Sequence, residues 1–165
     1  MTISRVRPLV DYVAQGMAFE VAHIEAAVAN SGGTHYWHFK SGDNSVVVFE
    51  RKVTTNGDEF EYQVFKDPTL TDDGTPVGIT GRNSGAGNSP VTTFFTDPAF
   101  SAEGAGIEPE YMPGASGQGQ STISQFSVDG AVRILEPNTS YLLKVTNNGA
   151  KNDATCQIYV LWGES

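Results

Sequence analysis

Apolar and polar residues alternate along the C-terminal part of the chain, over residues 141–145 and again over 156–162. Side chains of a β-strand point alternately to its two faces, so each segment is predicted to be a strand with one core-facing set. The two sets are Tyr141, Leu143 and Val145, and Cys156, Ile158, Val160 and Trp162. A short stretch that contains Asn147-Asn148-Gly149 separates the segments, and we expect them to form adjacent strands.

The strongest local signal lies between residues 46 and 65. Two runs of β-branched and aromatic residues, 46–53 and 60–65, flank Asn56-Gly57-Asp58. Asn-Gly readily takes the positive φ values of a tight turn, so this segment is predicted to be a β-hairpin. Asp67-Pro68 follows the second run and ends it.

Most of the remaining chain also favours strands. Residues 34–40 alternate, and short strands are predicted at 91–96 and 123–128. Residues 17–29 fit a helix or a strand, because they contain good helix formers as well as an alternating pattern. We interpret them as a strand, since every later segment is one.

Long glycine-rich loops and an N-terminal arm complete the predicted organisation. The loops are 81–90 and 114–120, and no repeat of fixed period is visible. A proline and a glycine interrupt the first residues, which predicts an arm over 1–16 and a single domain over 17–165. About nine or ten short strands with such connections indicate an all-β fold, an antiparallel β-sandwich or jelly roll.

Composition and charge narrow the range of partners. The chain has 165 residues and a net charge of −9, and this acidic balance opposes binding to nucleic acid phosphates. No segment reaches the apolar length of a membrane span, and the first residues lack the apolar run of a signal peptide. We therefore expect a protein of a reducing cytoplasm with no nucleic acid and no membrane partner. Cys156, the single cysteine, is predicted to be a buried thiol.

The histidines and aspartates do not form a recognisable metal site. His35 and His38 would share one face of a helix, but on a strand they point to opposite faces, which disfavours a shared ion. His23 stands alone in the sequence. Three aspartates lack the spacing of a calcium-binding loop, and turn formation explains them better. They are Asp67, Asp72 and Asp73.

Motifs for enzymatic catalysis are also missing from the sequence. Glu103, Glu108 and Glu110 lie among Gly and Pro, and their spacing does not place them as a glycosidase pair. Residues 81–87 do not fit a phosphate-binding loop, and no GxSxG motif occurs. The sequence therefore predicts a protein without enzymatic activity, cofactor or metal. A sandwich-fold lyase or glycosidase stays as a third interpretation, for which no catalytic group is visible.

Three stretches of the chain together resemble the sequences of a known protein family. The first is the N-terminal strand pair that ends in Tyr36-Trp37-His38-Phe39. The middle stretch comprises Asp73-Gly74-Thr75-Pro76-Val77, Gly81-Arg82-Asn83-Ser84 and Phe100-Ser101-Ala102-Glu103-Gly104. The last comprises Ile134-Leu135-Glu136-Pro137-Asn138-Thr139-Ser140-Tyr141-Leu142-Leu143 and Tyr159-Val160-Leu161-Trp162-Gly163-Glu164. In these stretches the chain resembles the small jelly-roll head decoration (cement) proteins of tailed bacteriophages.

The resemblance implies a non-enzymatic structural role. Such proteins are commonly trimers on the outer surface of the capsid, where they bridge major capsid subunits. It therefore implies a homotrimer, the major capsid protein as partner, and a place on the exterior of a virion that is assembled in the host cytoplasm. Many weakly bound copies on a lattice would stabilise it through multivalency.

The segments that fit no strand are the candidate contacts with the capsid or with sister subunits: residues 3–13 and the loops 81–90 and 114–120. The candidate residues are Leu9, Val10, Tyr12, Arg82, Asn83, Asn88 and Gln118. The alternative function is a carbohydrate-binding β-sandwich module of a tail or fibre protein. In that case exposed aromatics such as Trp37 or Tyr111 would stack on sugar rings.

Overall fold

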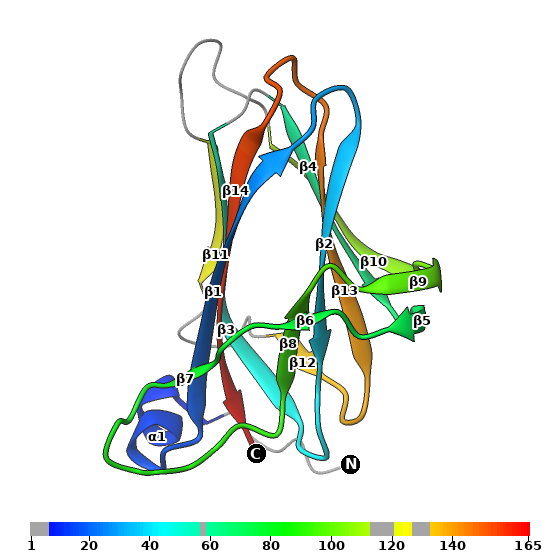
Figure 1. The fold of residues 1–165 in the computed structure, drawn as a ribbon. Coiled ribbons are helices and arrows are strands. Elements are labelled where there is room, and N and C mark those ends of the chain that lie inside the picture. Colours follow the sequence, from blue (N-terminus) through cyan, green and yellow to red (C-terminus); the bar gives the residue numbers. More distant parts are fainter. Residues whose placement is uncertain (1–6, 57–58, 113–120, 127–132) are drawn as a thin grey trace.

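The computed structural model describes residues 7–56, 59–112, 121–126 and 133–165, which form two antiparallel β-sheets packed face to face (Figure 1). The predicted all-β sandwich is thereby confirmed. Residues 17–29 and 34–40 form strands as predicted. Within the described residues, no helix is long and apolar enough to span a membrane.

The first sheet contains β1 (Ala18–Val28), β3 (Val46–Thr55), β7 (Thr80–Gly81), β11 (Ser121–Phe126), β12 (Arg133–Leu135) and β14 (Ala154–Glu164). The second contains β2 (Gly33–Lys40), β4 (Phe60–Lys66), β6 (Thr75–Pro76), β8 (Thr93–Thr96), β10 (Ala105–Met112) and β13 (Ser140–Asn147). The strand orders are β11-β3-β14-β1-β7, with β12 also paired to β3, and β10-β4-β13-β2-β8-β6. A separate pair, β5 (Thr69–Asp72) and β9 (Ala99–Ala102), and the helix α1 (Leu9–Ala14) complete the fold.

The core lies between the two sheets and is rich in aromatic and β-branched side chains. Trp37 of β2 and Trp162 of β14 are fully buried, and the Phe39 ring lies 5.3 Å from the Trp162 ring. Burial of one such side chain contributes about 1.5–3 kcal/mol. Cys156 is buried as predicted, and burial, with the Glu25 carboxylate adding to it, raises the pKa of the thiol to about 12. The thiol is therefore protonated at neutral pH.

Two predicted strand pairs are wrong, because consecutive strands lie in opposite sheets. β3 belongs to the first sheet and β4 to the second, while β13 belongs to the second and β14 to the first. After β3, the N–H of Asn56 donates to Thr155 O of the first sheet, whereas Glu59 O accepts from the N–H groups of Asn148 and Gly149, which follow a strand of the second. Two strands that face each other across a core alternate as two neighbours do, so the pattern does not distinguish them.

The pairing of the long strands is nested along the chain. β1 pairs with β14, β2 with β13, β3 with β11, and β4 with β10, all antiparallel. Of these eight strands, β1, β14, β3 and β11 lie in the first sheet, and β2, β13, β4 and β10 lie in the second. The first half of the chain therefore pairs with the second half in antiparallel fashion, and successive pairs alternate between the two sheets.

Helix α1 packs on the outer face of the first sheet, so residues 9–14 of the predicted arm are held against the domain. Tyr12 is 4% exposed, and its ring lies 5.5 Å from the Phe49 ring. Gly163 makes room for this contact, since a Cβ there would lie 2.5 Å from the Tyr12 ring. The second buried cluster consists of Tyr12, Ala18, Val47, Phe49 and Leu161. The helical part of the predicted arm thus belongs to the packing of the domain; residues 1–6 lie outside the described residues.

Strands β5 and β9 pair with each other and belong to a short motif that occurs twice. One copy runs from Asp67-Pro68 to Gly74, and the other from Asp97-Pro98 to Gly104. Both aspartates have a φ of 55°, and the two glycines have φ values of 99° and 92°. This single pair of similar segments is not a repeat of fixed period, and the sequence pattern did not reveal it.

The two copies of the motif interlock through their glycines. A Cβ on Gly74 would lie 2.4 Å from Thr96 O, and a Cβ on Gly104 would lie 2.2 Å from Lys66 O. The end of each copy therefore lies directly against the beginning of the other. Positive φ and a backbone carbonyl at this distance leave room for glycine only.

Candidate functional site

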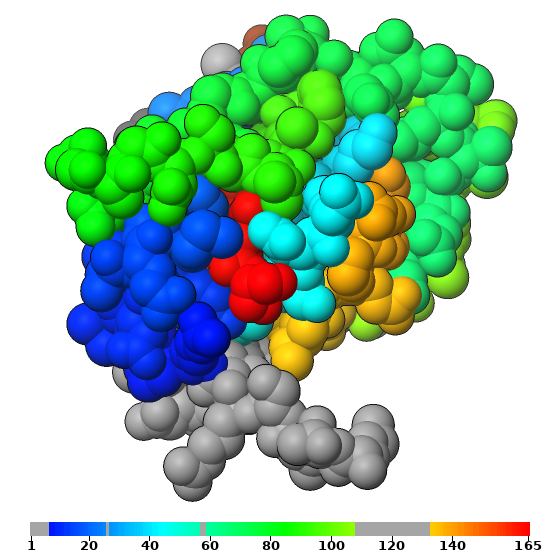
Figure 2. Space-filling view, turned by 90° about the horizontal axis from the view of Figure 1, so that it is seen from below, coloured from blue at the N-terminus to red at the C-terminus, as the bar shows by residue number. Residues whose placement is uncertain are grey.

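Helix α1 and the loop 82–90 meet at one end of the sandwich and form one continuous surface, called the end surface below (residues 9–16 and 82–92; Figure 2). Asn83 Nδ2 donates to Val13 O at 3.1 Å, and Asn88 Nδ2 donates to Gln15 O at 3.0 Å. These bonds satisfy carbonyls at the C-terminal end of the helix, where intrahelical partners run out. The loop is thereby held in a defined position although it contains no strand.

An ion pair anchors the beginning of the loop. Arg82 Nη1 donates to Glu20 Oε2 at 2.9 Å, and Tyr159 Oη donates to the same oxygen at 2.7 Å. The backbone is held as well, because the N–H of Arg82 donates to Ala18 O at 2.9 Å. Burial and the hydrogen bond to Glu20 raise the pKa of Tyr159, so its phenol remains a donor.

A buried carboxylate anchors the end of the loop. Glu164 is 1% exposed and accepts hydrogen bonds from the N–H of Val91 at 3.0 Å, the N–H of Thr92 at 3.1 Å and Trp162 Nε1 at 3.2 Å. A buried carboxylate is tolerated where several N–H groups satisfy it. Sequence reasoning missed Glu164, because a glutamate at the end of an apolar strand gives no sign of burial.

Six of the seven predicted contact residues belong to this end surface, and Gln118 lies outside the described residues. Most of the six hold the surface together. Tyr12 is the buried residue of α1 and packs on the first sheet, while Arg82, Asn83 and Asn88 make the hydrogen bonds described above. Direct contact of the six with a partner remains a prediction, but the structure gives Tyr12, Arg82, Asn83 and Asn88 a role within the chain.

Two apolar side chains face outward at this end, beside exposed polar and charged ones such as Asp11, Arg82 and Asn88. Val10 is 68% exposed and Leu9 is half-buried. Val91, which the sequence did not single out, is 47% exposed. The stretch from 83 to 96 contains no charged residue. The end surface therefore offers Val10 on α1 and Val91 on a loop that has no charged residue after Arg82, whereas the chain as a whole is acidic.

A hollow of about 330 Å³ opens beside the loop, between residues 76–79 and β8. Its lining consists of Pro76, Val77, Ile79, Pro90, Thr92, Thr93, Phe94 and Phe95. No charged side chain lines it, so the hollow is uncharged like the part of the loop that follows Arg82.

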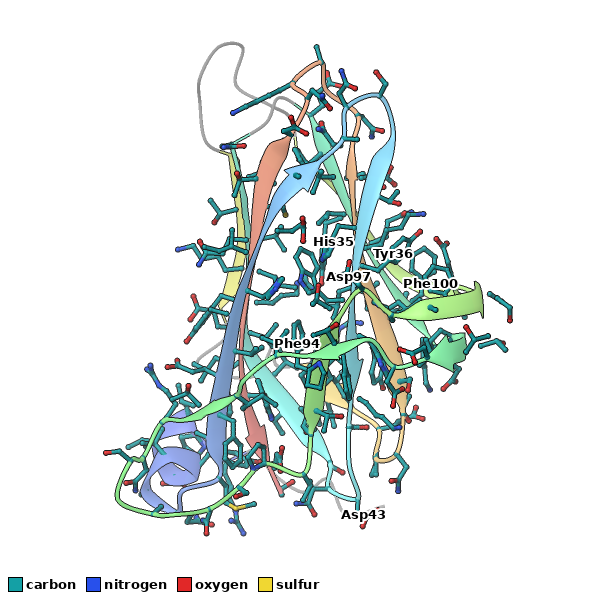
Figure 3. All side chains as sticks on the ribbon, in the orientation of Figure 1. His35, Tyr36, Asp43, Phe94, Asp97 and Phe100 are labelled. Atoms are coloured by element: carbon teal, nitrogen blue, oxygen red, sulfur yellow. The ribbon has the colours of Figure 1, made fainter. Side chains whose placement is uncertain are left out.

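Polar side chains gather around His35 between the sheets (Figure 3). His35 Nδ1 lies 3.6 Å from Glu25 Oε2 and 3.5 Å from Asp97 Oδ1, and its Nε2 lies 3.0 Å from Thr96 Oγ1. His23 does not stand alone, since its ring stacks on His35 with centroids 6.3 Å apart. Burial lowers the pKa of His35 against the opposing effect of the two carboxylates. Among the described residues, no three such side chains are placed to hold a metal ion.

His38 lies on the other face of β2, as predicted, and contacts a serine and an aspartate. Its Nε2 lies 3.0 Å from Ser140 Oγ, and its Nδ1 lies 3.5 Å from Asp73 Oδ1. These are the atom pairs of a Ser-His-Asp triad. However, His38 is fully buried and stacked on Phe95 with centroids 5.3 Å apart, and burial lowers its pKa. A substrate therefore has no access to the imidazole, and the three residues act in packing.

A polar network fixes the β5–β9 pair on the outer face of the second sheet. Tyr36 Oη donates to Glu103 Oε1 at 2.5 Å, and Lys144 Nζ donates to the same oxygen at 2.8 Å. The Phe100 ring packs 4.8 Å from the Tyr36 ring, and both rings lie on the outer face of the second sheet (Figure 3). Burial favours the neutral carboxyl, but the hydrogen bonds from Lys144 and Tyr36, with the charge of Lys144, outweigh it and lower the pKa of Glu103.

Replacing Glu103 with glutamine should lower the free energy of unfolding by about 1 kcal/mol at pH 7. Because its pKa is lower in the folded chain, Glu103 stabilises the fold above its unfolded pKa, and this contribution is lost as the pH falls through the folded pKa. Urea unfolding should therefore show a difference from wild type that shrinks below roughly pH 4. Glu59→Gln, at an exposed position, is the control. A difference for Glu103→Gln that stays constant down to pH 3 would contradict the assignment.

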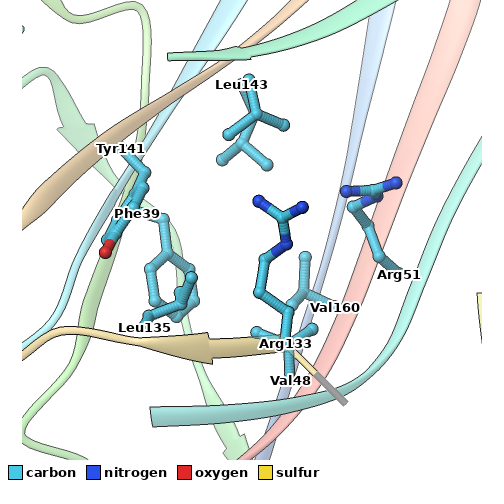
Figure 4. A pocket seen from close by; sticks show the side chains of 9 residues that line it. Phe39, Val48, Arg51, Arg133, Leu135, Tyr141, Leu143 and Val160 are labelled. Carbon is cyan, nitrogen blue, oxygen red and sulfur yellow. The ribbon is translucent and has the colours of Figure 1, made fainter. Parts of the chain in front are cut away.

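A small cavity lies between the sheets beside β12 (Figure 4). Its volume of about 40 Å³ holds one or two water molecules and is far below that of a ligand pocket. The guanidinium groups of Arg51 and Arg133 point toward it. Its other lining residues are Phe39, Val48, Val64, Leu135, Tyr141, Leu143 and Val160. This cavity is therefore not a binding site for an organic ligand.

The interpretation of Trp37 as a sugar-stacking residue is wrong. Its side chain is fully buried, and Nε1 donates to His23 Nδ1 at 3.0 Å. Among the described residues, the exposed large hydrophobic side chains are all aliphatic: Val10, Ile24, Val91, Ile107 and Ile134. The side chain of Tyr111 lies outside the described part of the structure.

Comparison with known proteins gives no family. No protein-family model matches the chain, and no curated protein matches it. Among solved structures, the infectious bursal disease virus Gt strain matches with a TM-score of 0.20 and 11% identity, over 98% of this chain and 41% of the viral chain. The Gx strain matches with a TM-score of 0.16 and 13% identity, over 88% and 41%. This chain thus spans about two fifths of those viral chains, and TM-scores at this level carry no argument about fold or function.

Proposed function

We propose that the chain is a non-enzymatic structural protein of a virion, which binds the outer surface of a capsid through its end surface. The end surface carries this proposal. Its backbone is fixed by Asn83, Asn88 and Glu164, while Val10 projects from α1 and Val91 from the uncharged part of the loop. An ordered surface with exposed apolar side chains loses little conformational entropy when a partner covers it.

The strand order supports a scaffold of this kind. Eight antiparallel strands that pair first with last and are divided between two sheets follow the plan of a jelly roll. We infer that the sandwich is one. Jelly rolls occur in viral capsid proteins and in lectins, so the fold agrees with the proposal without deciding it. No described residue favours the lectin interpretation, because the exposed large hydrophobic side chains are aliphatic.

The partner in this proposal is the major capsid protein on the exterior of the virion. The net charge of −9 disfavours the genome as a partner. On a capsid lattice, many copies would bind at once, so a modest affinity for each copy is sufficient. The homotrimer implied by the resemblance stays a prediction.

Val10→Asp should weaken binding to the capsid by about tenfold or more, because the new carboxylate loses its water in an apolar contact. The measurement is co-sedimentation with empty capsids of the virus that, on this proposal, encodes the chain. Ile107→Asp is the matched control, since Ile107 is 36% exposed on β10, away from the end surface. Wild-type protein that does not sediment with capsids, or equal binding of both variants, would overturn the proposal.

A further inference from the structure

One edge of the first sheet is open along most of strand β1. β1 pairs with β14 along one side, but on its other side β7 covers only Phe19 and Glu20. In the described part of the chain, no strand pairs with this side of residues 21–28. A strand edge of this kind is a template for another strand.

The backbone groups of Ala22 and Ile24 point toward this open edge. On the side of β7, Ala18 O accepts from the N–H of Arg82. Along a strand, the N–H and C=O groups of every second residue point to the same edge, so those of Glu20, Ala22 and Ile24 follow the direction of Ala18. Within the described residues, no hydrogen bond reaches the backbone of Ala22 or Ile24 on that edge.

The outer face of residues 21–25 carries apolar side chains, and the bulge of this strand lies beyond them, between Glu25 and Val28. Ala22 is exposed, and Ile24 is 58% exposed. The titratable residues of this segment, His23 and Glu25, turn inward to the polar group around His35. A solvent-facing lysine or proline, which commonly blocks strand addition, does not occur between 21 and 28.

We propose that this edge takes the same edge of a second copy of the chain, in an antiparallel pair whose two-fold axis passes through Ile24. The segment Ala22-His23-Ile24-Glu25-Ala26 is self-complementary in this register. Ile24 lies opposite Ile24 of the second copy, and each His23 lies opposite a Glu25. The outward backbone groups of both Ile24 residues then bond to each other.

Charge selects this register over its neighbours. A shift that centres the pair on Glu25 sets two carboxylates directly opposite each other, which is destabilising. A shift that centres it on His23 sets Ala26 of the second copy opposite Glu20, where β7 already pairs, whereas the Ile24 register brings only Val28, the last residue of the strand, to that position. The self-complementary sequence favours a second copy over an extended segment of a different protein. A two-fold contact of this kind closes at two copies, so it predicts a dimer in place of the trimer implied by the resemblance.

Cysteine substitution tests the register. In a hydrogen-bonded antiparallel pair, opposite Cα atoms lie about 5.5 Å apart, within the range of a disulfide. Ile24→Cys should therefore form a covalent dimer under mild oxidation. Ala22→Cys is the matched control, because the two copies of residue 22 lie about 14 Å apart in this register. Cys156 does not interfere, since it is fully buried.

Sedimentation velocity of the full chain provides the second measurement. Wild type should shift from 17.7 kDa to twice that mass as its concentration rises. Ile24→Asp should remain a monomer with an unchanged circular dichroism spectrum, because its carboxylates would oppose each other. A monomeric wild type, a trimer that Ile24→Asp leaves intact, or cross-linking through residue 22 would each overturn the proposal. The inference rests on no part of the proposed function, and capsid binding is measured separately.

Discussion

Glu164→Ala is expected to lower the free energy of unfolding by about 4 kcal/mol. The substitution removes the acceptor of three N–H groups, those of Val91, Thr92 and the Trp162 indole, at a site that is 1% exposed. Each buried donor left without a partner costs about 1–3 kcal/mol, and local rearrangement recovers part of the sum. Urea unfolding followed by tryptophan fluorescence measures the change.

Two variants serve as controls for Glu164. Glu164→Gln keeps one carbonyl oxygen but sets an NH2 group against the backbone donors, so it should lose about half as much stability. Glu136→Ala removes a glutamate whose side chain is 67% exposed in its ion pair with Lys66, and should change stability by less than about 1 kcal/mol. Equal losses for Glu164→Ala and Glu136→Ala would show that the buried carboxylate does not anchor the loop.

Gly104→Ala is expected to destabilise the chain by about 3 kcal/mol. Gly104 has a φ of 92°, and a Cβ there would lie 2.2 Å from Lys66 O, a backbone atom that a side-chain rotation cannot move away. The interlocked motif would have to open to accept the methyl group. Thermal and urea unfolding should both show the loss.

Gly87→Ala is the matched control for this strain. Gly87 also has a positive φ, of 67°, but nothing lies within 4 Å of a Cβ placed there. Only the left-handed conformation is then unfavourable, at about 1 kcal/mol. If the two substitutions destabilise the chain equally, the contact between the two motif copies contributes nothing.

The strands and their buried faces follow from the local pattern of side chains. Alternation predicted the strand at 34–40 and placed His35 and His38 on opposite faces. It also predicted the burial of Cys156. These properties depend on residues within a few positions of each other, and hydrophobic periodicity reports them directly.

The partners of each strand depend on distant parts of the chain, and the pattern does not contain them. Asn56-Gly57 suits a hairpin turn, yet the chain crosses there between the sheets because β14 and β13 supply the partners of β3 and β4. The end surface shows the same limit. Asn83 and Asn88 stood out as residues in a loop, but their bonds to the carbonyls of α1 require the fold. Glu164 gave no signal at all.

The nested order of strands bears on how the chain folds. β14 lies between β1 and β3, so the first sheet lacks its central strand until the segment Ala154–Glu164 has left the ribosome. The contacts that join it are distant in sequence, and such topologies fold in milliseconds to seconds, more slowly than helical bundles. During synthesis, β1 and β3 therefore wait with unpaired edges, a state in which chaperones commonly protect a chain from aggregation.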